Sequence, residues 1–156
     1  EVVGVGAIKY ADLSQNRQSP IIFEWDKILS FEGNTAPYLQ YSYARIQSIL
    51  RKAAAEGKEI DYSKEIKIEN KQERALADHI ATFPMVVLKA AESFKPNIIA
   101  DYLFELSKKF NSFYNSCPIL NQEDDILYSR GLIAKVAGET IKEGLSLLGI
   151  KTLDRM

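Results

Sequence analysis

The chain has 156 residues, of which 46% are hydrophobic and 26% are charged, a composition typical of a folded globular protein. Its 20 basic and 21 acidic residues give a net charge of -1, so nucleic acid would have to be bound through a local basic patch. The single cysteine and single histidine exclude an intramolecular disulfide and a zinc site made of several such ligands. No apolar run is long enough to cross a membrane, and the N-terminus has no signal-peptide pattern.

Residues 1–33 are predicted to be a short mixed segment. Alanine and valine between residues 2 and 13 are compatible with a short helix, although two glycines weaken it. Ile21, Ile22 and Phe23 form a short run of residues that favour β-structure. The sequence shows no partner for these pieces, and the chain begins with Glu1 rather than Met. Residues 1–33 are therefore interpreted as the end of a larger region, and the chain as a fragment or processed product.

A helix with two different faces is predicted between residue 34 and Gly57. Asn34 and Thr35 are both candidate N-caps, Pro37 suits the first turn, and Gly57 suits the C-terminal end. At 100° per residue one face of this helix is apolar and needs a core: Leu39, Tyr43, Ile46, Leu50 and Ala53. A separate face carries aromatic and basic side chains: Tyr38, Tyr41, Arg45 and Lys52.

Four more helices are predicted further along the chain. Residues 58–70 are polar and are interpreted as a linker across the surface. In 71–82 we expect Leu76 and Ile80 on the inner face, together with Phe83 just beyond it, and Glu73 and Arg74 outside.

Prolines and glycines mark the limits of the remaining helices. One helix follows Pro84, another opens at Pro96 and carries a broad apolar stripe to Cys117, and the last begins at Asp124. Gly149 and Ile150 fit a Schellman-type end of that last helix. The predicted fold is all-α: a bundle of about five helices over residues 34–156, preceded by the mixed segment.

Catalytic patterns are missing from this sequence. It has no Walker-type phosphate loop, no GxSxG motif and no complete dinucleotide fingerprint. Cys117 and His79 could pair as nucleophile and base, but Cys117 falls on the apolar side of its helix, which is typical of a buried structural thiol. We therefore expect no catalytic residue, bound cofactor or metal in this chain.

The aromatic and basic face of the 34–57 helix is the best candidate for a binding site. Tyr38, Tyr41 and Arg45 suit stacking on bases and contact with phosphates. Asn111 and Tyr114, three residues apart, add an amide and a ring on the flank of the 96–117 helix. The ordinary interpretation of such residues is the polar or aromatic edge of a core. The pattern alone leaves both interpretations open.

Several separated segments resemble arginyl-tRNA synthetases in the order in which that family has them. They are VGVGAIKYADL, GNTAPYLQYSYARIQSILRKA, ERALADHIATFPMVV, IADYLFELSKKFNSFYNSCPIL and LLGIKTLDRM. The resemblance covers nearly the whole chain and is weakest at 58–70 and 119–125. It implies that residues 34–156 are the family's helical C-terminal anticodon-binding domain, called the DALR domain, and that residues 1–33 are the end of a class I catalytic region.

The same resemblance implies which residues contact RNA. In the family, anticodon-loop nucleotides contact the positions of Tyr38, Tyr41, Arg45 and Tyr114, and the C-terminal end, here Met156. Together with the flanking amide, the expected residues that bind the anticodon loop of tRNA(Arg) are Tyr38, Tyr41, Arg45, Asn111, Tyr114 and Met156. The ending LDRM resembles a native terminus, whose free carboxylate could take part. Many members have His where this chain has Tyr43, which lies on the predicted core face.

The family's HIGH and KMSKS signatures, which bind ATP, do not occur here. The resemblance therefore implies that ligation of arginine to its tRNA, with ATP and Mg²⁺, belongs to a catalytic domain of the same parent chain. We expect a cytoplasmic protein that is a monomer and has no membrane partner. The alternative is a helical protein-interaction module without RNA binding, which would grip a partner helix with the same aromatic surface.

Overall fold

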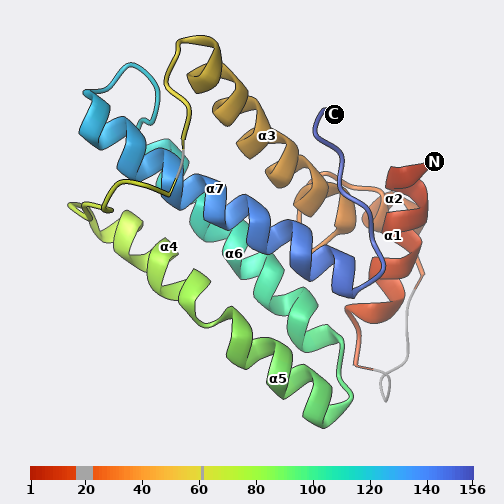
Figure 1. Cartoon of the computed structure of the whole chain (residues 1–156). Helices are drawn as coiled ribbons and strands as arrows, with labels where there is room; N and C mark the ends of the chain where they lie inside the picture. Colours follow the sequence, from red (N-terminus) through yellow and green to blue (C-terminus); the bar gives the residue numbers. More distant parts are fainter. Residues whose placement is uncertain (17–22, 61) are drawn as a thin grey trace.

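The structure is a computed structural model that describes residues 1–16, 23–60 and 62–156. Within these ranges the chain forms helices and no strand: α1 (Val2–Leu13), α2 (Trp25–Ile28), α3 (Ala36–Ala55), α4 (Lys71–Ala81), α5 (Phe83–Ser93), α6 (Asn97–Ser116) and α7 (Asp124–Leu147). In Figure 1, α7 crosses the middle of the bundle, with α3 and α1 on one side of it and the α4–α5 pair on the other. The prediction of an all-α fold is confirmed.

Helix α3 begins and ends where its sequence predicts. The Thr35 hydroxyl caps it by accepting a hydrogen bond from the Tyr38 N–H at 3.3 Å. Asn34 is not the cap; its side chain instead accepts from the Tyr10 hydroxyl at 2.6 Å. At the other end Gly57 has a φ of +75°, and the N–H of Lys58 closes the helix on the Ala53 carbonyl at 2.9 Å. A glycine suits this left-handed position because it has no Cβ to clash.

The predicted apolar face of α3 forms the centre of the core. Leu39 and Ile46 are fully buried and Tyr43 nearly so, on a helix that packs against α7, α1 and α6. Two glycines of α7 allow its neighbours to approach closely: a Cβ at Gly138 would lie 2.9 Å from the Ile46 side chain, and one at Gly144 would lie 2.6 Å from Leu103. These helices therefore pack with almost no space for larger side chains.

The expectation that residues 1–33 lack a partner is wrong for their first helix. Helix α1 packs on α3 and α6, and Tyr10 lies fully buried in the core. Two acceptors lie within hydrogen-bond distance of the single Tyr10 hydroxyl proton, Asn34 Oδ1 at 2.6 Å and the Ala100 carbonyl at 3.0 Å, so this buried polar group is satisfied. The described part of 1–33 holds α1 and α2 and no strand; Ile21 and Ile22 lie outside the described residues.

The prediction that Glu73 lies outside the bundle is also wrong. Its carboxylate is buried and accepts from the Arg130 side chain at 2.8 Å and from the Glu69 and Asn70 N–H groups at 2.7 and 3.0 Å. Burial alone would raise the pKa of Glu73, but these hydrogen bonds outweigh it and lower the pKa below 4.5. Periodicity missed this position because the partner, Arg130, is 57 residues away on α7.

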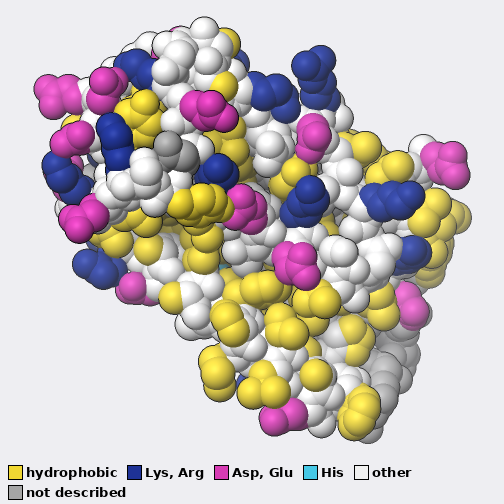
Figure 2. Space-filling view, in the orientation of Figure 1, with side chains coloured by type: hydrophobic (Ala, Val, Ile, Leu, Met, Phe, Trp, Pro, Cys, Tyr) yellow, Lys and Arg dark blue, Asp and Glu magenta, His cyan; other side chains and the backbone are white. Residues whose placement is uncertain are grey.

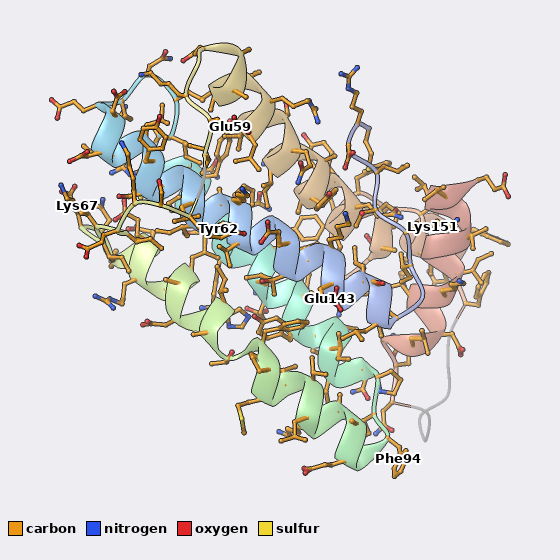
Figure 3. All side chains as sticks on the ribbon, in the orientation of Figure 1. Glu59, Tyr62, Lys67, Phe94, Glu143 and Lys151 are labelled. Carbon is orange, nitrogen blue, oxygen red and sulfur yellow. The ribbon has the colours of Figure 1, made fainter. Side chains whose placement is uncertain are left out.

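The polar linker 58–70 does cross the surface, but one of its side chains enters the core. Ile60 is buried in a small cluster with Ala53, Leu127 and Leu132. It fits there because Gly131 has no side chain. A Cβ at position 131 would lie only 2.7 Å from the Ile60 side chain. Tyr62, labelled in Figure 3 over α7, follows it and donates a hydrogen bond to Glu139. The linker is therefore anchored along α7.

Helix α5 leaves part of its apolar surface uncovered. Figure 2 shows hydrophobic side chains gathered over the α5 side of the molecule, where Met85 is 66% exposed and Phe94 is 74% exposed. Phe94 ends the helix with a φ of +54°, a left-handed conformation that is rare for a bulky residue. Among the described residues, none of the helices is sufficiently long and apolar to cross a membrane.

Truncating Ile46 to alanine should lower the free energy of unfolding by about 2–4 kcal/mol, because it deletes buried methyl groups and leaves a cavity beside Gly138. The matched control is Ile8→Ala on the exposed side of α1. This variant should change the free energy of unfolding by less than about 0.5 kcal/mol. Urea unfolding followed by circular dichroism measures both. Equal effects would contradict the assignment of Ile46 to the core.

Glu73→Gln should destabilise the protein by about 3 kcal/mol at neutral pH, because it leaves the Arg130 charge buried without its partner. A carboxylate with a lowered pKa stabilises the fold above pH 4.5, and this contribution is lost as the pH falls through the folded-state pKa. The difference between wild type and variant should therefore shrink in acid. Unfolding curves between pH 7 and 3 test this, and a difference that stays constant would contradict it.

Candidate nucleic-acid interface

Side chains from α3 and α6 meet around the guanidinium of Arg45. Its Nη1 donates to the Asn111 Oδ1 at 3.1 Å and its Nη2 to the Tyr41 hydroxyl at 3.0 Å. The Asn111 amide in turn donates to the Tyr38 hydroxyl at 2.7 Å. We call Tyr38, Tyr41, Arg45, Asn111 and Tyr114 the Arg45 cluster. Helical spacing explains it, because Tyr41 and Arg45 lie one turn apart on α3, and Asn111 and Tyr114 one turn apart on α6.

Two aromatic rings of the cluster flank the Arg45 charge. The Arg45 Cζ lies 4.9 Å from the centre of the Tyr41 ring and 5.7 Å from that of Tyr114, both within the range of cation–π attraction. Tyr41 is 40% exposed and Tyr114 is 37% exposed. The arrangement thus holds two partly exposed rings and a positive charge together at the surface.

Contacts with neighbouring phenylalanines hold the tyrosine rings, and Phe31 meets the Tyr41 ring edge-on at 6.4 Å. Tyr114 stacks on the fully buried Phe110, with ring centres 6.0 Å apart. Tyr38 is half-buried, and its ring packs edge-on against Phe104 at 5.8 Å. Because the Tyr38 hydroxyl accepts from Asn111, this side chain orients the amide rather than presenting an open ring face.

The C-terminal residues return past α3 and bring Met156 to the same surface (Figure 1). Three side chains of α3 hold this tail: Gln40 donates to the Lys151 carbonyl at 2.7 Å, Tyr43 to the Asp154 carboxylate at 3.0 Å, and Arg51 to the Asp154 carbonyl at 2.9 Å. Burial and the hydrogen bond to Asp154 raise the pKa of Tyr43, so its hydroxyl stays a neutral donor. Figure 3 labels Lys151 where the tail leaves α7.

The tail and α3 line an open hollow of about 380 Å³ beside the Arg45 cluster. We call it the tail hollow, and its lining consists of Tyr41, Ala44, Arg45, Ser48, Arg51, Arg155 and Met156. Tyr41 and Arg45 thus belong to both the cluster and the hollow. The two features form one continuous surface.

All six residues predicted to bind RNA therefore lie in this surface, five in the cluster and Met156 in the tail hollow. Lys52, placed on the same face by the sequence, is exposed but does not line the hollow. Sequence reasoning missed Ser48, Arg51 and Arg155. Ser48 follows Arg45 at i+3 and could have been found by that spacing. Arg51, at i+6, lies about 120° away around the helix, and the place of Arg155 depends on the path of the tail, so spacing could not find these two.

Cys117 and His79, which the sequence offered as a possible nucleophile and base, lie outside the Arg45 cluster and the tail hollow. Cys117 is buried, and burial raises the pKa of its thiol, which keeps it in the unreactive protonated form. His79 stacks on Tyr102 with ring centres 4.4 Å apart. Among the residues that the structure describes, no three His, Cys, Asp or Glu side chains group as a metal site would require.

Comparison with known proteins gives consistent results. Residues 39–156 match the family model described as the DALR anticodon binding domain. Over its full length the chain is 66% identical to an arginine–tRNA ligase of Fusobacterium nucleatum and 47% identical to one of Cyanothece, and it covers 27% of each. The chain thus spans about a quarter of the length of these curated relatives.

Solved structures of the same kind share the fold. A Thermus thermophilus arginyl-tRNA synthetase superposes with a TM-score of 0.89 at 33% identity, and one from Plasmodium falciparum with a TM-score of 0.85 at 29% identity. Each match covers 99% of this chain and 27% of the other. Because the family model matches well over half of the residues and the fold agrees, the chain belongs to the DALR anticodon binding domain family.

Proposed function

We propose that this chain is the anticodon-binding part of an arginine–tRNA ligase and holds the anticodon loop of tRNA(Arg) for aminoacylation. The observation that carries the proposal is the Arg45 cluster, in which two partly exposed rings, an amide and a charge converge at one surface. Single-stranded loops are recognised by stacking their bases on such rings and by hydrogen bonds to base edges. Membership of the DALR family supports the same role.

Each cluster residue has a distinct part in this proposal. Tyr41 and Tyr114 stack on unpaired bases, each stack being worth about 1–3 kcal/mol. Arg45 contacts sugar or phosphate while its position is fixed by neutral partners. Asn111 presents its amide to a base edge and is oriented by Tyr38. Met156 closes the end of the site from the tail.

The ligation itself would take place on a catalytic domain in the remaining part of a longer protein. ATP and Mg²⁺ would bind there, away from the residues described above. We place the boundary near residue 34, with residues 1–33 as the end of the catalytic region. Since α1 packs on α3, that end would be rigidly joined to the helix that carries Tyr41 and Arg45. The protein would act as a cytoplasmic monomer.

The rival function, a protein-interaction module, has no support from the family or from the relatives. Salt distinguishes the two experimentally. Binding to tRNA should weaken steeply as salt rises, because phosphates release bound counterions. Docking of an apolar helix would not weaken in this way.

Tyr114→Ala should weaken binding of tRNA(Arg) by about 5- to 150-fold, the equivalent of one lost base stack. The control is Tyr62→Ala, which removes an exposed tyrosine from the linker and should leave binding unchanged. Filter binding or fluorescence anisotropy measures the affinity, and circular dichroism confirms the fold. A folded Tyr114→Ala variant with wild-type affinity would contradict the role of this ring.

A further inference from the structure

Three arginines surround the tail hollow. Arg45 and Arg51 reach it from α3, and Arg155 reaches it from the C-terminal tail. Ser48, which lies midway between Arg45 and Arg51 along α3, adds a hydroxyl to the lining. The lining contains no Asp or Glu side chain, so three arginines meet at one small space in a chain whose net charge is -1; another charged group near it is the terminal carboxylate of Met156.

These arginines differ from the other arginines that the structure describes. Arg130 is paired with Glu73 at 2.8 Å, and Arg74 lies 3.9 Å from the Asp78 carboxylate. Within the described residues, no carboxylate lies at ion-pair distance from the three arginines of the hollow. None of the three guanidinium groups is therefore held in an ion pair within the described residues.

The acceptors near these arginines are neutral groups. Arg45 donates to an amide and a hydroxyl, and Arg51 donates one N–H to the Asp154 carbonyl. The Asp154 carboxylate itself accepts from Tyr43 at 3.0 Å. Because a guanidinium has five N–H donors, Arg51 keeps donors for another ligand after holding the tail. Guanidinium donors that are left over in this way can bind the oxygen atoms of an anion.

We propose that the tail hollow binds backbone phosphates of the RNA strand next to the bases held by the Arg45 cluster, with Arg51, Arg155 and Ser48 as the contacting residues. This inference rests on the proposed function. Guanidinium forks match phosphate oxygens in two-point contacts. Such contacts set the position of the strand without reading its sequence, whereas the neighbouring rings and amide face the bases. The tail thereby becomes one wall of the path of the RNA.

The decisive variant is Arg155→Gln, because Arg155 is exposed in the tail. Loss of one phosphate contact to a single strand reduces the slope of log K against log salt by about 0.7. Between 50 and 200 mM salt, the affinity of the variant for tRNA(Arg) should therefore fall about 2.6-fold less than that of wild type. The reduction should be equal for tRNA(Arg) and for a copy with an altered anticodon, because a phosphate contact carries no sequence information.

Two further variants separate charge from support of the tail. Arg51→Lys keeps the charge and should keep the salt slope, while Arg51→Gln should reduce it by about 0.7. Arg74→Gln, which removes an exposed arginine from α4, is the matched control and should leave the slope unchanged. Preference of wild type for tRNA(Arg) over the altered copy checks the proposed function independently.

The possible outcomes are distinct. If wild type binds and discriminates but Arg155→Gln keeps the full slope, the phosphate site is wrong and the proposed function stands. If wild type does not discriminate between the two RNAs, the proposed function fails. Inorganic phosphate is the last probe. If it raises the melting temperature of wild type but not of Arg155→Gln, while the two proteins show the same salt slope for RNA binding, the hollow binds free phosphate and the inference is overturned.

Discussion

The candidate interface depends on the position of one charge, the Arg45 guanidinium between α3 and α6. It bridges the two helices through Tyr41 on its own helix and Asn111 on the other. Since these partners are neutral, they fix the side chain without cancelling its charge. A carboxylate in their place would hold the arginine equally well but would weaken its attraction for a phosphate.

The rigidity of the bundle gives this arrangement its accuracy. Phe110, buried in the core, supports Tyr114 from below, and Tyr38 orients Asn111. On the core-facing side of α3, Ile46 meets Gly138 of α7 at close range, so the helix has little freedom to shift. The tail is held on the same helix by Gln40, Tyr43 and Arg51. One helix therefore positions the rings, the charge and the chain end.

The sequence predicted the features that depend on local patterns. Helix periodicity found the core face of α3, including Tyr43. The family resemblance selected Tyr38, Tyr41, Arg45 and Tyr114, and the pattern on the flank of α6 added Asn111. Glu73 and Ile60 escaped prediction because their burial depends on Arg130 and Gly131 of the distant helix α7. The place of Arg155 depends on the course of the tail, which no spacing rule encodes. Contacts between distant segments thus account for the errors.

In the proposed function, the surface around Arg45 distinguishes one anticodon loop from another. The most direct test of this discrimination is a titration of wild type and Arg45→Gln with tRNA(Arg) and with a copy in which only the anticodon is changed. Wild type should bind tRNA(Arg) more tightly than the altered copy, and Arg45→Gln should weaken binding while its circular dichroism spectrum remains native. Equal binding of both RNAs by wild type, or unchanged binding by a folded Arg45→Gln variant, would contradict this proposal.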